Sequence, residues 1–150
     1  MRATLGGQNL VVVTDRFRDG QLRGTGMEAF PERQDTEFDW FALDDAGEVA
    51  VFATAGLGLV PVQVRAASEL HDAMGDRITV TGWGTPTVWD SYTRVGLFVY
   101  DWDDQRRCYA RVGQPSRPIG KNLSAPLAAM ALPRLRRSFR NSPCVAADEA

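Results

Sequence analysis

The stretch "FDWFALDDAGEVAVFATAGLGLVP", residues 38 to 61, predicts the central element of the fold. Its two halves, residues 38–43 and 48–54, are rich in the aromatic and β-branched residues that strands favour. Between them, residues 44–47 read "DDAG", and the glycine can adopt the positive φ of a tight turn. Both faces of these strands are apolar, which is typical of strands covered on both sides. We therefore expect a β-hairpin in the core, with its turn displayed to solvent.

A helix is expected directly after this stretch. Pro61 suits the first turn of a helix, and apolar residues follow at helical spacing from Val62 to Ala73. Gly75 supplies a stop. Residues 77–83, "RITVTGW", favour a short strand, and residues 84–91, "GTPTVWDS", have the composition of a loop.

The second half of the chain repeats the hairpin pattern. Residues 94–102, "RVGLFVYDW", predict a strand, and residues 103–105 predict a turn. Residues 106–112, "RRCYARV", predict a partner strand with one solvent-exposed face. A connector that contains two prolines follows at residues 113–122. From Ser124 a helix is expected, with Leu132, Leu135 and Phe139 on one side and a kink at Pro133.

These elements predict an α+β fold with a mainly antiparallel sheet built from two hairpins, one helix between them and a C-terminal helix packed on the sheet. Residues 1–36 show little apolar periodicity and are expected to form a loose arm. Residues 37–140 then form one domain, and residues 141–150 an unanchored tail. The length of 150 residues suits a single domain of this kind.

Charge is divided unevenly along the chain. Residues 37–104 hold 12 acidic and 3 basic residues, whereas residues 105–150 hold 9 basic and 2 acidic ones. Such asymmetry indicates a charged partner, or one half of a fold neutralising the other. The C-terminal arginines favour a solvated helix face over phosphate contacts, so we do not expect a nucleic-acid partner.

Cysteine content and apolar runs bear on location. Cys108 and Cys144 are expected to be free thiols, because nothing obvious holds Cys144 in place. The longest apolar run near the start, residues 10–13, is too short for a signal core, and no run approaches a membrane span. We expect a cytoplasmic protein with no membrane partner.

Catalytic and metal-binding signatures are sparse. His71 is the one histidine, and it lies at the border of the predicted helix's apolar face, which favours a structural role. The chain has no G-x-S-x-G elbow and no C-x-x-C or H-E-x-x-H spacing. We expect no catalytic residue, no metal ligand and no cofactor.

Three further features leave alternatives open. Gly56 and Gly58 precede a predicted helix and could present amides to an anion, although a glycine-rich turn explains them better. Asp101 and Asp103 would share one face of a strand and could hold a cation or act as acid and base, although a turn role is favoured at Asp103. Trp83 and Trp89 flank an exposed loop, which suits an interface as well as a core.

The succession of residues also resembles a loosely defined group of small bacterial proteins, some of which look like immunity proteins encoded beside toxins. The resemblance spans about residues 37–140 and implies a cytosolic binding protein more than an enzyme. It brings no functional residues with it. The residues that carry it are Phe38, Asp39, Trp40, Phe41, Ala42, Asp44, Gly47, Phe52, Thr54, Gly56, Tyr100, Asp101, Tyr109, Val112, Pro115 and Pro118.

We therefore expect a non-enzymatic, immunity-like binding protein that uses an acidic and aromatic surface to bind and neutralise a partner protein such as a toxin. The alternative is a small-ligand or metal-dependent enzyme that uses Asp101, Asp103 and the Gly56–Gly58 turn. The predicted partner-binding residues are Asp44, Asp45, Trp83, Trp89, Asp101, Asp103 and Asp104.

Overall fold

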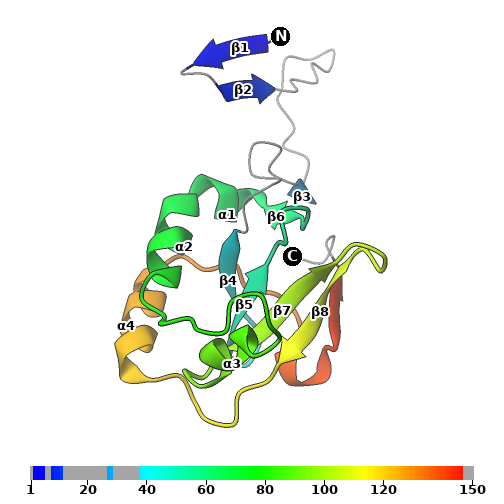
Figure 1. The fold of residues 1–150 in the computed structure, drawn as a ribbon. Coiled ribbons are helices and arrows are strands. Elements are labelled where there is room, and N and C mark those ends of the chain that lie inside the picture. Colours follow the sequence, from blue (N-terminus) through cyan, green and yellow to red (C-terminus); the bar gives the residue numbers. More distant parts are fainter. Residues whose placement is uncertain (1, 6–7, 12–26, 29–37, 147–150) are drawn as a thin grey trace.

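The computed structural model describes residues 2–5, 8–11, 27–28 and 38–146 (Figure 1). Two short strands, β1 (Arg2–Leu5) and β2 (Gln8–Val11), pair antiparallel with each other. A third, β3 (Met27–Glu28), pairs with β6 (Val60–Pro61). The remaining elements belong to the continuous described segment that starts at Phe38.

A five-stranded sheet forms the centre of this segment, in the order β4-β5-β7-β8-β9. Its strands are β4 (Asp39–Leu43), β5 (Val49–Ala53), β7 (Phe98–Asp103), β8 (Cys108–Gly113) and β9 (Cys144–Ala146). Strand β7 runs parallel to β5, and the other three neighbouring pairs are antiparallel. The predicted α+β class is confirmed, and the sheet is mixed.

Parallel pairing of β5 and β7 requires a crossover connection, and this connection contains three helices where one was expected. They are α1 (Val62–Ala66), α2 (Ser68–Gly75) and α3 (Val88–Thr93). The expected single helix is interrupted at Ala67, and α3 lies where the composition favoured a loop. The expected strand at residues 77–83 does not form, and this segment is irregular.

The sheet is covered on both faces, as its apolar strands predict. Trp40, Phe52 and Tyr100 lie on one face in stacked contact, with ring centroids of neighbouring pairs 4.3 and 4.9 Å apart. Residues that alternate with them, such as Phe41 and Val51, pack on the other face beneath α2, α3 and α4 (Lys121–Ala129).

The outer edge of β4 is closed by groups from distant parts of the chain. The amide of Leu43 donates to the carbonyl of Pro133 (2.9 Å), and the amide of Leu135 donates to the carbonyl of Leu43 (2.8 Å). Further along the edge, the amide of Phe41 donates to Nδ1 of His71 on α2 (3.1 Å). Figure 1 shows α2 and α4 beside this edge and β8 at the other side of the sheet. These contacts remove an exposed strand edge, which would otherwise favour aggregation.

The C-terminal third differs from the expected kinked helix. Helix α4 ends at Ala129, and the following chain is largely extended until a single 3₁₀ turn at Phe139–Asn141. Leu135 and Phe139 are buried against the sheet from this extended chain. The reason is tertiary: the edge of β4 supplies backbone partners on both sides of Arg134, so an extended chain there satisfies its hydrogen bonds better than a helix would.

The expected unanchored tail also differs over its described part. Residues 144–146 form β9, which pairs with β8 at the edge of the sheet. The Tyr100 hydroxyl donates to the carbonyl of Ser142 (2.7 Å), just before this strand. Burial of Tyr100 raises its pKa to about 12, so the hydroxyl keeps its proton at neutral pH.

The prediction of two free thiols is wrong, because Cys108 and Cys144 form a disulfide. In the β8–β9 pairing, Cys108 lies opposite Ala146 and Cys144 opposite Ala110, so the two cysteines are diagonal neighbours. Their Cα atoms are 6.2 Å apart, within the range that a disulfide spans. The sequence pattern missed this bond because it missed β9.

Candidate functional site

The feature that best fits a binding site surrounds Trp83, whose side chain is 64% exposed. Two adjoining hollows, of about 290 and 340 Å³, share Asp39, Trp83 and Tyr92 in their walls. Trp89 and Ala53 also line one hollow, and residues of α2 and of the segment after it line the other. We call the pair of hollows the Trp83 cleft.

Backbone turns hold the loop that carries Trp83. Gly82 and Gly84 flank the tryptophan with φ of +77° and +79°, a conformation that other residues rarely adopt. The carbonyl of Gly82 accepts hydrogen bonds from the amide (3.0 Å) and the hydroxyl (2.8 Å) of Thr85. The amide of Thr81 donates to the hydroxyl of Ser91 on α3 (3.0 Å). The loop therefore presents Trp83 in an ordered position, which reduces the entropy cost of binding.

The floor of the cleft comes from the sheet. Asp39 lies opposite Ala53 in the β4–β5 ladder, and Ala53 lies opposite Asp101 in the β5–β7 ladder. Paired residues in adjacent strands point to the same face, so the two carboxylates flank a small alanine on the side of the sheet that α3 covers. The Tyr92 hydroxyl donates to Oδ2 of Asp39 (2.9 Å).

His71 lies in the wall of the second hollow but belongs to the fold. Its side chain is buried, and its Nδ1 accepts the amide proton of Phe41. Burial lowers the pKa of His71 to about 4, against the opposing effect of the Asp72 carboxylate. The imidazole is therefore neutral at pH 7 and closes the edge of β4, as its predicted structural role requires.

The cleft is lined by one sign of charge. Asp39, Asp72 and Asp76 contribute carboxylates, and none of the described residues that line either hollow is an arginine or a lysine. An exposed tryptophan beside carboxylates offers apolar area together with charge. This arrangement fits a basic, partly apolar group from another molecule.

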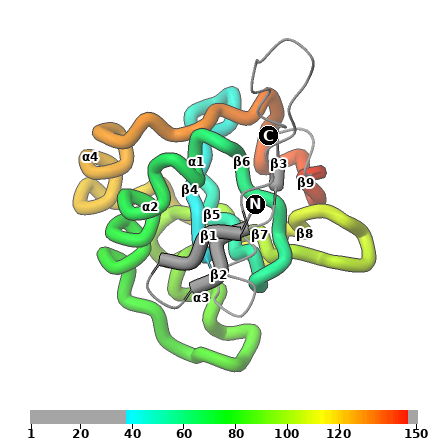
Figure 2. The backbone as a smooth tube through the Cα atoms, turned by 90° about the horizontal axis from the view of Figure 1, so that it is seen from above, coloured from blue at the N-terminus to red at the C-terminus, as the bar shows by residue number. Residues whose placement is uncertain are grey.

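Of the seven predicted binding residues, Trp83 and Trp89 line the cleft, and Asp101 lies on the neighbouring strand beside its floor. Asp103 and Asp104 lie at the β7–β8 turn, which projects from the rest of the described segment (Figure 2). Each is paired locally, because Asp103 contacts Arg106 (3.3 Å) and Asp104 contacts Arg107 (3.0 Å). This turn is therefore not an acidic patch.

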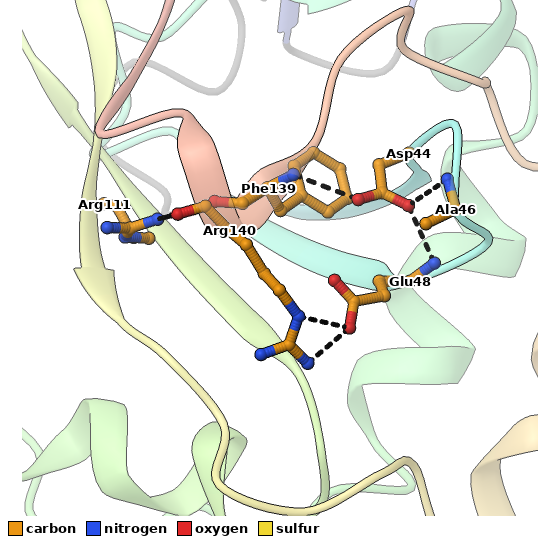
Figure 3. A network of polar contacts seen from close by, with 6 residues as sticks. All are labelled: Asp44, Ala46, Glu48, Arg111, Phe139 and Arg140. Atoms are coloured by element: carbon orange, nitrogen blue, oxygen red, sulfur yellow. Dashed lines mark hydrogen bonds and ion pairs between the residues drawn. The ribbon is translucent and has the colours of Figure 1, made fainter.

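Asp44 and Asp45 lie at the other end of β4 from the cleft, about 17 and 20 Å from Asp39 at the usual rise of a strand. Asp45 is exposed, but Asp44 is fully buried and cannot contact a partner. Oδ1 of Asp44 accepts the amides of Ala46 (2.9 Å) and Glu48 (2.8 Å), and Oδ2 accepts the amide of Phe139 (3.0 Å), as Figure 3 shows. Asp44 therefore joins the β4–β5 turn to the C-terminal segment.

The glycines of the alternative, enzymatic interpretation have structural roles. The amides of Gly56 and Gly58 both bond to Thr54, to its hydroxyl (3.3 Å) and its carbonyl (2.7 Å) respectively. Gly58 also packs against the ring of Tyr109, whose hydroxyl donates to the carbonyl of Leu59 (2.7 Å) and whose pKa is raised by burial. Within the described residues, no group of three or more His, Cys, Asp or Glu side chains is placed to hold a metal ion.

The sequence patterns missed Asp39, Tyr92, Asp72 and Asp76 as cleft residues. A signal existed only for Asp39, since a carboxylate in an otherwise aromatic and apolar strand calls for an explanation. Asp72 lies on α2, Asp76 directly follows it and Tyr92 lies on α3, so their meeting depends on how the crossover packs on the sheet.

No family model, curated protein or solved structure matches the chain. None of the helices in the described ranges has the length and apolar character needed to cross a bilayer.

Proposed function

We propose that this chain is a non-enzymatic, immunity-like binding protein that binds and neutralises a basic partner protein, such as a toxin, through the Trp83 cleft. The observation that carries the proposal is an exposed, ordered tryptophan at a cleft lined by carboxylates and by no described basic residue. Binding energy at protein interfaces concentrates in such aromatic anchors. The carboxylates would attract a basic partner and accelerate its association.

A cytoplasmic location forms part of the proposal, and the disulfide adds a condition to it. Thiols stay reduced in most cytoplasms, so binding there must not require the Cys108–Cys144 bond. The disulfide joins β8 to β9, whereas β4, β5, α2, α3 and the segment between these two helices supply the cleft. The proposal therefore requires equal affinity for the partner with and without a reducing agent.

The test is affinity capture from the native cell, with the full unmodified chain and four full-length single-residue variants as bait. Trp83→Ala and Asp76→Lys alter the cleft, and Leu70→Ala and Asp45→Lys make matched changes at exposed residues that do not line it. A partner should be enriched by the unmodified chain, and Trp83→Ala should weaken its affinity about 30-fold, as the loss of a hot-spot residue does. The Leu70→Ala and Asp45→Lys variants should bind normally.

The captured partner is then purified, its affinity measured by calorimetry, and its toxicity assayed with and without this chain. Growth inhibition that co-expression of the chain relieves would support neutralisation. Equal capture by all four variants would refute the Trp83 cleft as the site. A partner whose activity is unchanged by binding would refute the immunity role but not the interface.

A further inference from the structure

A hollow of about 700 Å³ lies away from the Trp83 cleft. Its walls are the β4–β5 turn, the connector at residues 115–119, helix α4 and the extended segment at residues 130–134. Leu43 and Val49, at the turn end of the hairpin, line it, whereas Asp39 and Ala53, at the opposite end, line the cleft. A volume of this size is typical of small-molecule sites. We call it the arginine groove.

The interior of the arginine groove is largely apolar. Helix α4 contributes Leu127 and Ala128. The apolar side chains that line the groove, besides its prolines, are Leu43, Val49, Ile119, Leu127, Ala128, Met130 and Leu132. An apolar chain or ring could therefore lie in the groove and release water from these surfaces.

The charged side chains that line the groove are three arginines and a single glutamate. Arg140 donates from Nε (3.0 Å) and Nη2 (2.6 Å) to one oxygen of Glu48, which orients its guanidinium (Figure 3). Arg134 donates from Nη1 to the carbonyl of Asp44 (2.9 Å). Arg117 is exposed on the connector.

Two of these guanidinium groups are thus held by contacts that use only part of their donors. A guanidinium has five N–H donors, so Arg134 and Arg140 each keep others for a ligand. With one carboxylate among three guanidinium groups, the groove carries a net positive charge. Planar anions such as carboxylates and phosphates are the ligands that such donors bind best.

From this combination we propose that the arginine groove binds a small amphipathic anion, with an apolar body on the hydrophobic wall and one carboxylate or phosphate head among Arg117, Arg134 and Arg140. The site is independent of the proposed partner interface. A long acidic peptide is a poorer fit, because the lining offers three arginines beside several apolar side chains, which suits one charged head with an apolar body.

The test uses decanoate and decyl phosphate as probes, with decanol and decyltrimethylammonium as controls, each below its micelle-forming concentration. Binding to the full chain is measured by calorimetry and by the shift in melting temperature, because a ligand of the folded state stabilises it. At least one of the two anions should bind saturably, and the alcohol and the cation at least tenfold more weakly. The preference between decanoate and decyl phosphate identifies the head group.

Matched variants locate the site. Ala128→Trp should fill the groove and abolish binding, whereas Ala129→Trp, at the next and also exposed position, should bind normally. Arg117→Gln should weaken anion binding about tenfold, and Arg136→Gln, which removes an exposed arginine outside the groove, should not. The connector position of Arg117 makes its substitution safe for folding, so the test stands even if Ala128→Trp does not fold.

The proposal would be overturned if neither anion bound, or if decanol or the cation bound as tightly as the anions. It would also be overturned if the two members of each matched pair of variants had equal effects on binding. Binding of an acidic peptide in place of both amphiphiles would overturn it as well. Trp83→Ala should leave anion binding unchanged, so the failure of either site is distinguishable from the failure of the other.

Discussion

Single buried polar residues connect distant parts of this chain. Asp44 accepts amides from its own turn and from Phe139, 95 positions later, and His71 accepts the amide of Phe41 from an edge strand. Each accepts a hydrogen bond from a backbone amide that has no partner within regular secondary structure. Buried donors that lose such a partner are costly, so these two residues give the clearest predictions for stability.

Asp44→Ala should lower the free energy of unfolding by about 3 kcal/mol, because three amide donors lose a charged acceptor. Asp45→Ala is the matched control, since its side chain is exposed in the same turn, and should change stability by less than about 0.5 kcal/mol. Urea unfolding followed by tryptophan fluorescence measures both. Similar losses for the two variants would show that Asp44 does not hold the C-terminal segment.

His71 should make stability depend on pH. Its pKa is about 4 in the folded chain against 6.5 when unfolded, so the unfolded state binds the proton more readily. The contribution of neutral His71 is fully present above pH 6.5 and is lost as the pH falls towards 4, by up to about 3 kcal/mol.

The difference in the pH dependence of unfolding free energy between the unmodified chain and His71→Asn isolates the effect of His71 from that of the carboxylates. The asparagine can still accept the Phe41 amide but does not titrate, so urea unfolding at pH 7.5 and pH 5 should show a steeper loss for the unmodified chain. Parallel pH profiles for the two proteins would contradict the assignment.

Among the elements, those with a strong local pattern were predictable and those set by distant partners were not. Residues 38–54 combine strand-forming residues with a glycine turn, and β4 and β5 pair there. Helix α3 has six residues and β9 three, too few to show a period. The spacing of Leu132, Leu135 and Phe139 mimics a helix, but the edge of β4 binds this chain in an extended form.

The element that depends most on a covalent bond is β9. Its three residues pair with β8, and the Cys108–Cys144 disulfide spans 36 positions. Replacing both cysteines by serine should lower the free energy of unfolding by about 4 kcal/mol, because the unfolded chain regains the entropy that the closed loop removes. Chemical denaturation of the oxidised and double-serine proteins tests this. A loss below 1 kcal/mol would mean that the noncovalent contacts of β9 suffice to hold it.

For the whole molecule, the sequence predicted the α+β class but located only part of the candidate cleft. Trp83 and Trp89 could be singled out because they flank a segment with the composition of a loop, although a core role suited them equally well, and both line the cleft. Asp44 and Asp45 could not be separated, because two adjacent aspartates suit the same turn, and the contact of Asp44 with Phe139 comes from a distant part of the chain. The arginine groove combines residues from 43 to 140 and has no local signature.

The disulfide also makes residues 108–144 a closed covalent ring that contains β8, the connector and α4. A protease that cuts the exposed connector once, between Gln114 and Gly120, would open the ring without separating the molecule into two pieces. The nicked protein would migrate as one band on a gel run without reductant and as two bands with it. Such a cut would split the arginine groove's connector wall while leaving the chain that builds the Trp83 cleft uncut.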